Sequence, residues 1–168
     1  AHDKVTLLDP VEDLATSPTI IAIDAIKCEF QVYERQHLDM MLLKAYVGFA
    51  AARHDTDVGG HEIIATGHWG CGAFANNERV MLVVQALAAD LAGVRLRYHC
   101  PTSLTGSVDL APAVSFLEEA SAQRLTVEAA LAKLAERCAA DPEWRTKVRP
   151  RKPRTRWPTD LWKMATKV

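Results

Sequence analysis

The stretch at residues 63–74 reads IIATGHWGCGAF, a short apolar strand that breaks into a glycine-rich loop. Three of the chain's eight glycines, Gly67, Gly70 and Gly72, fall within six residues of one another there. Glycines let backbone N–H groups turn toward a ligand, and the N-terminus of a following helix favours negative charge. The stretch therefore predicts either a cradle for a diphosphate or a turn that the sheet itself requires.

Strand and helix patterns alternate on both sides of this loop. The first half is expected to hold a buried strand at 19–26, a helix with an apolar stripe from Leu38 to Phe49, and a strand at 62–66. A helix capped by Asn76 or Asn77 and ended by Gly93 follows, and then a strand at 94–100. The second half is expected to hold a helix after Asp109 that buries Leu110, Ala113, Val114 and Leu117, a helix capped by Thr126 with a stripe from Val127 to Cys138, and a short turn at Asp141-Pro142. This order predicts an α/β layered domain with a small, mostly parallel sheet.

The expected strand at 94–100 has two different faces. Val94, Leu96, Tyr98 and Cys100 share one face, while Arg95, Arg97 and His99 share the other. Such alternation is typical of a strand at a sheet edge or of one with a polar partner. Three strands are few for this many helices, so either Val5–Leu8 adds a strand or something outside this chain completes the sheet.

Composition indicates one domain, because 168 residues of which 49% are hydrophobic can bury a core. No stretch approaches the roughly 18 apolar residues of a membrane-spanning helix. The four cysteines are widely spaced and form no C-x-x-C pair, which is typical of reduced thiols in an intracellular compartment. An organelle, reached after removal of a targeting segment, is the alternative location.

Basic residues gather at the C-terminus. Residues 145–168 carry nine Lys or Arg against Asp160 alone, although the whole chain has a net charge of −1. We therefore divide the chain into an α/β domain at 1–142 and a basic tail at 143–168 that docks onto a partner, with a solvated arm as the alternative. The expected partner-binding residues are Arg149, Arg151, Lys152, Arg154, Arg156, Trp157 and Trp162. RNA or another polyanion and an acidic protein surface are comparable targets.

The segment 20–137 resembles the C-terminal half of the catalytic domain of poly(ADP-ribose) glycohydrolase, a macrodomain-related enzyme. The likeness is carried by Ile21–Ala25, Leu43–Tyr46, Gly48-Phe49, Ala65–Gly67, Trp69–Phe74, Gln85, Leu87–Ala89 and Tyr98. The resemblance implies a partial, three-layer macrodomain-like fold and an ADP-ribose ligand. It also implies that the loop wraps the diphosphate and that Phe74 packs near the terminal ribose, which makes Gly70, Cys71, Gly72, Ala73 and Phe74 the candidate ligand-binding residues.

The departures from the family pattern concern catalysis. The family's triple glycine followed by Gln-Glu-Glu, whose second Glu is the general acid, is absent from these 168 residues. The only Glu-Glu pair, Glu118-Glu119, has no glycines before it. His68 stands where the family usually has Asn, Asn76-Asn77 replaces Gly-Asp, and Pro101 replaces an aromatic residue.

The sequence therefore favours a pseudoenzyme, a non-catalytic structural or interaction subunit of a larger protein complex, with no catalytic residue, no metal and no cofactor. The alternatives are an active glycohydrolase whose catalytic loop lies on another segment or chain, and an ADP-ribose reader that does not hydrolyse.

Three other candidates have plainer interpretations. Cys71 has no obvious base among its neighbours in sequence, so a packed thiol is expected rather than a nucleophile. His54, His61 and His68 recur every seven residues, but a loop and a strand would separate them, so metal binding is not expected. Asp24 ends the first expected strand, where it is expected to cap a neighbouring backbone rather than do chemistry.

Overall fold

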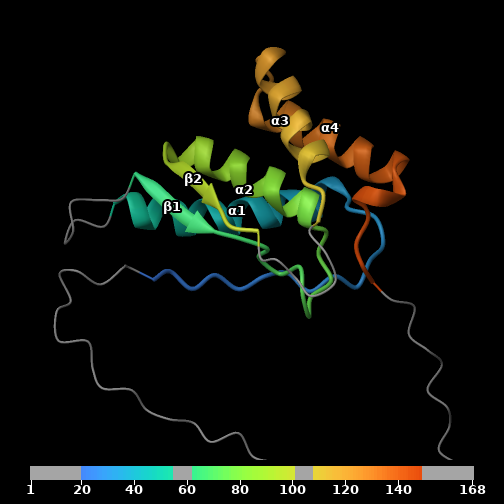
Figure 1. Cartoon of the computed structure of the whole chain (residues 1–168), viewed down its shortest axis with the longest axis horizontal. Coiled ribbons are helices and arrows are strands. Elements are labelled where there is room, and N and C mark those ends of the chain that lie inside the picture. Colours follow the sequence, from blue (N-terminus) through green and yellow to red (C-terminus); the bar gives the residue numbers. More distant parts are fainter. Residues whose placement is uncertain (1–19, 55–61, 101–107, 149–168) are drawn as a thin grey trace, which may run out of the picture.

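A computed structural model describes residues 20–54, 62–100 and 108–148, which fold into helices that pack together and cover one face of a small sheet (Figure 1). The elements of this part are α1 (Arg35–Arg53), β1 (Ile63–Thr66), α2 (Glu78–Ala92), β2 (Arg95–Tyr98), α3 (Ala111–Ala122), α4 (Val127–Ala140) and the 3-10 turn η2 (Pro142–Trp144). None of these helices is long and apolar enough to cross a membrane. The predicted α/β class with a small parallel sheet is confirmed for the described residues.

The sheet of the described residues consists of β1 and β2, which run parallel with Ile63 opposite Arg95 and Thr66 opposite Tyr98. Ile64 and Leu96 turn toward a core that α1 and α2 build behind the sheet. Arg95 and Arg97 are exposed on the other face, which confirms the predicted alternation. Cys100 is exposed, contrary to its predicted place on the apolar face, because it lies beyond the end of β2.

The strand predicted at 19–26 is wrong for its described part, since residues 20–26 run extended but join no ladder. Side chains from the glycine loop take up two of the carbonyls that a ladder would use. Trp69 Nε1 donates to Ile23 O at 3.1 Å, and Asn76 Nδ2 donates to Ile26 O at 2.8 Å. Ile20 is accordingly 85% exposed rather than buried. Val5–Leu8, the other predicted strand, lies outside the described residues.

Helix α2 is the centre of the core, and both of its ends form as the sequence predicts. Asn77 Oδ1 accepts from the amides of Arg79 and Val80, so it satisfies donors that the first turn leaves free. Gly93 ends the helix with φ +65°, a left-handed conformation that favours glycine. Between these ends, α2 packs against α1, α3 and α4.

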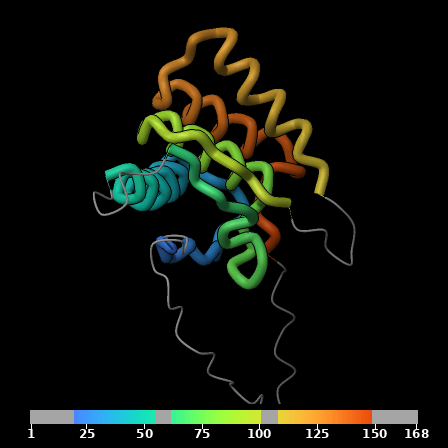
Figure 2. The backbone as a smooth tube through the Cα atoms, turned by 60° about the vertical axis from the view of Figure 1, so that its left-hand side comes forward, coloured from blue at the N-terminus to red at the C-terminus, as the bar shows by residue number. Residues whose placement is uncertain are grey.

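The α3–α4 hairpin covers α2 on the side away from residues 20–30, as both views show (Figures 1 and 2). Ala130, Leu131, Leu134 and Cys138 of α4 are buried as predicted, and Thr126 caps the helix. The predicted buried face of α3 is partly wrong. Val114 is 46% exposed, while Phe116 and Ala120 join Ala113 in the core, so the buried stripe is rotated by about one residue.

The chain after α4 returns to the body. Trp144, in η2, is 1% exposed and lies in the main core cluster. The described part of the expected tail, residues 143–148, is thus packed on the domain. The partner-binding residues predicted between Arg149 and Trp162 lie outside the described residues, so the docking tail stays a prediction.

Candidate functional site

The glycine loop joins β1 to α2 through two tight turns. The amide of Cys71 donates to His68 O, and that of Ala75 donates to Gly72 O, both at 3.1 Å. Gly70 has φ +72°, and a Cβ added there would lie 2.6 Å from Asn76 Nδ2 and 2.7 Å from Ala25 Cβ. Glycine is therefore required at position 70 for both its backbone conformation and its neighbours.

The tip of the loop presents backbone donors to solvent. Within the described part of the chain, the amides of Gly72, Ala73 and Phe74 donate to no other group, and all three residues are exposed. Consecutive free N–H groups in a turn can bind anionic oxygens. The structure thus brings three of the five predicted ligand-binding positions, Gly72, Ala73 and Phe74, to one open surface. Gly70 is half-buried, and the Cys71 side chain is buried.

The N-terminus of α2 is already occupied. The Asn77 side chain caps it, and the Glu78 carboxylate, whose side chain is 8% exposed, forms an ion pair with Lys147. A carboxylate in the first helical turn already compensates the positive end of the helix dipole. A diphosphate at this site would therefore depend on the loop amides rather than on the helix end.

Asn76 fixes the loop from inside. Its side chain is fully buried, and Oδ1 accepts from Cys28 Sγ at 2.9 Å and from Tyr33 OH at 3.2 Å. Its Nδ2 donates to Ile26 O at 2.8 Å and to Gly70 O at 3.2 Å. One side chain therefore joins the loop to the extended segment before α1. The sequence predicted only a helix cap here.

The C-terminal clamp, residues 143–147, holds the exit of the loop. Asn77 Nδ2 donates to the carbonyls of Glu143 and Arg145 at 2.8 and 2.9 Å. The Lys147 amide donates to Ala75 O at 2.8 Å. Sequence reasoning missed this clamp. The one available signal was the pair of adjacent asparagines after the glycines.

Cys71 is a packed thiol, as the sequence favours. It is 8% exposed, and burial, together with the nearby Glu78 carboxylate, raises the pKa of its thiol to about 12. Its Sγ donates to Trp69 O at 3.5 Å, and the described residues offer it no other hydrogen bond. A thiol that stays protonated at neutral pH is a poor nucleophile.

The thiols give a pH prediction. Burial also raises the pKa values of Cys28 and Cys138, the latter to about 12, whereas Cys100 is exposed. Unfolded thiols ionise with a pKa near 9.0, so above that pH the unfolded state binds fewer protons than the folded state. The free energy of unfolding therefore falls as the pH rises toward 12.

We expect iodoacetamide at pH 8 to modify Cys100 at least tenfold faster than the other three cysteines, measured by peptide mass spectrometry. Equal rates in the folded protein would contradict this burial.

The remaining candidates are Asp24, which has a different partner from the one predicted, and the three histidines, which were not expected to bind a metal. Asp24 does not cap a neighbouring backbone. Both of its carboxylate oxygens accept from Lys44 Nζ at 2.6 Å, and this partner holds the pKa of Asp24 below its usual range. His54 follows α1 and His68 lies in the loop, while His61 is outside the described residues. No group of three potential metal ligands is present among the residues described.

His68 and Tyr98 lie at the carboxyl ends of the two strands, with their ring centroids 5.8 Å apart. His68 Nε2 and the Tyr98 hydroxyl are buried and have no hydrogen-bond partner in the described structure. Burial raises the pKa of Tyr98, so its hydroxyl is a neutral donor. Sequence reasoning noted each residue separately and did not predict that they meet.

A matched pair of glycines tests the loop geometry. Gly70→Ala is expected to lower the free energy of unfolding by about 2 kcal/mol, because it adds left-handed strain and a contact with Asn76. Gly72→Ala is the control, since an added Cβ there meets nothing within 4 Å. Urea denaturation measures both, and an equal loss in the two variants would contradict the geometry.

Comparison with known families identifies a relationship for most of the chain. Residues 3–105 match the model of a family described as poly(ADP-ribose) glycohydrolase (PARG), Macro domain fold. The match covers more than half of the 168 residues and includes the glycine loop. It starts before the expected segment 20–137 and ends earlier, so α3, α4 and the C-terminal clamp lie beyond it.

Proposed function

Because this chain belongs to the poly(ADP-ribose) glycohydrolase family, we propose that it is a non-catalytic interaction subunit that keeps the family's glycine loop without its general acid. The main observation behind the proposal is that the carboxylate beside the loop, Glu78, already has a partner. Glu78 is buried and ion-paired with Lys147, so it is not free to protonate a leaving ribose oxygen. The absence of the triple-glycine and Gln-Glu-Glu motif from the chain supports the same conclusion.

One face of the sheet is uncovered in the described part of the chain, and this supports a role in an assembly. Strands of parallel sheets are usually covered on both faces. Here Ile63 is 41% exposed, and Arg95 and Arg97 are exposed on the same face. A protein partner with acidic and apolar side chains would complement that surface. The basic residues after Val148 would add contacts to protein or to RNA.

The test of the main proposal is an assay of the purified chain with poly(ADP-ribose). We expect no release of ADP-ribose above the background of a heat-denatured sample. Release at a rate proportional to protein concentration would overturn the proposal. If a second polypeptide that carries the missing motif restores release, the alternative of an active enzyme completed by another chain is supported instead.

The open amides of residues 72–74 favour a second candidate, an ADP-ribose reader that does not hydrolyse. Calorimetric titration with ADP-ribose decides this. A reader should give saturable heat. Its affinity for ADP-ribose should fall at least tenfold in Phe74→Ala, since Phe74 lies at the open loop and is 39% exposed. Leu91→Ala is the control, because Leu91 is also exposed, at 48%, but lies near the end of α2, away from the loop. No heat at millimolar ADP-ribose rules the reader out.

A further inference from the structure

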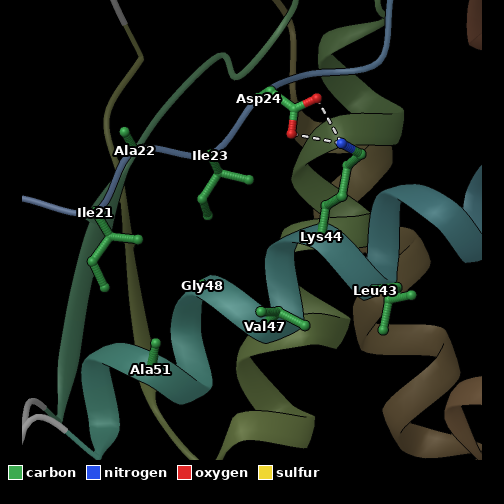
Figure 3. A pocket seen from close by; sticks show the side chains of 9 residues that line it. All are labelled: Ile21, Ala22, Ile23, Asp24, Leu43, Lys44, Val47, Gly48 and Ala51. Atoms are coloured by element: carbon green, nitrogen blue, oxygen red, sulfur yellow. Dashed lines mark hydrogen bonds and ion pairs between the residues drawn. The ribbon is translucent and has the colours of Figure 1, made fainter.

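An apolar groove of about 450 Å³ runs between the extended residues 21–24 and α1 (Figure 3). Its walls include Ile21, Ile23, Leu43, Val47, Gly48 and Ala51. Ile21 and Ile23 point toward α1 and Ala22 points away, as in a β-strand. The absence of a side chain at Gly48 lets Ile23 seat directly on the helix, since an added Cβ would fall 2.2 Å from Ile23 Cδ1.

No segment among the described residues fills this groove. Leu43 and Val47 are 60% and 57% exposed, although they lie beside buried residues of α1. Residues 21–24 have strand-like alternation, yet among the described residues the Trp69 indole is their one backbone hydrogen-bond partner. An added strand would bury the apolar side chains and pair the free backbone groups together.

We propose that the chain's own Val5–Leu8 occupies this groove as a strand antiparallel to residues 21–24. The family match begins at residue 3, so these residues belong to the matched domain rather than to a leader before it. Val5 and Leu7 would share one face of such a strand, which suits the apolar wall of α1. Asp9-Pro10 follows at once and would end the strand.

Length and position fit this occupant. The proposed strand Val5–Leu8 has four residues, and four consecutive residues, 21–24, line one side of the groove. The twelve residues from 9 to 20 can span up to about 40 Å, more than a return beside Ile21 requires. The Asp24–Lys44 ion pair stands at one end of the groove (Figure 3). This inference goes beyond the proposed function, because it assigns the groove to this chain and leaves the β2 side and the tail for partners.

Disulfide trapping tests the placement. In a Cys100→Ser background, which removes the exposed thiol, Leu7→Cys is combined with Val47→Cys in the groove. The control combines Leu7→Cys with Val114→Cys, since Val114 is similarly exposed but lies on α3. After mild oxidation we expect an intramolecular Leu7–Val47 link at least tenfold more abundant than the control link, measured by peptide mass spectrometry on the monomer fraction. Equal abundance overturns the proposal, and a linked dimer assigns the groove to a second copy and also overturns it.

Hydrogen exchange gives a second measurement that requires no new bond. Val5→Asp and Leu7→Asp together should speed exchange of the amides at 21–24 at least tenfold, because the added strand is lost. The amides of α1 should keep their protection, which shows that the variant remains folded. Val114→Asp is the control and should change neither set. Unchanged exchange at 21–24 in the doubly substituted, folded protein overturns the proposal.

Discussion

Trp144→Ala is expected to lower the free energy of unfolding by about 4 kcal/mol, the largest loss that we predict for a single substitution. The Trp144 side chain is 1% exposed in the main core cluster. Its ring packs against Phe116, with centroids 5.9 Å apart, and the Arg137 guanidinium lies 5.8 Å from its centroid. Alanine would leave a cavity between α3, α4 and the C-terminal clamp. Urea denaturation followed by circular dichroism measures the loss.

Trp157→Ala is the matched control, since it removes the same side chain from the segment predicted to dock onto a partner. We expect its effect on the isolated chain to stay below about 0.5 kcal/mol, as for surface substitutions. A loss below about 1 kcal/mol for Trp144→Ala would contradict the packing described above. A loss at Trp157 as large as that at Trp144 would place Trp157 in the core and contradict the docking tail.

Asn76→Ala is expected to cost about 3 kcal/mol of unfolding free energy. The substitution removes two donated and two accepted hydrogen bonds from a fully buried position. The carbonyls of Ile26 and Gly70 would then be left without this donor, and a buried unsatisfied group costs about 1–3 kcal/mol. Because those carbonyls belong to the extended segment and to the loop, exchange of the amides at 70–76 should also become faster.

Gln123→Ala is the control for this loss. Gln123 is exposed, and its side-chain amide donates to Glu119 at 3.0 Å on the surface of α3. Its removal should change stability by less than about 0.5 kcal/mol. If Asn76→Ala proves as mild as Gln123→Ala, the buried network does not hold the loop.

Local sequence patterns predicted the elements whose formation depends on local chemistry. Helix α2 was predicted from an apolar stripe, an Asn cap and a terminal glycine, and each of these acts within one turn of the helix. The glycine loop was predicted because three closely spaced glycines after a strand have few other uses. The family match at residues 3–105 includes this stretch.

Features that depend on distant partners could not be predicted in the same way. The apolar run at 19–26 resembles a buried strand, but a ladder requires a neighbour, and the loop side chains take the carbonyls instead. The rotation of α3 depends on where α2 and Trp144 lie, and this does not follow from the periodicity of α3 alone. Asn76 and Asn77 were recognised as caps, whereas their other bonds join segments up to 68 residues apart.

The C-terminal clamp separates two boundaries that are often assumed to coincide. The family match ends at residue 105, yet the exit of the glycine loop is bonded to Glu143, Arg145 and Lys147. A fragment cut at the end of the match would keep every residue of the glycine loop but lose these bonds and the Trp144 side chain. The part of the chain that holds the glycine loop in shape is therefore larger than the matched segment, because residues 143–147 bond to its exit.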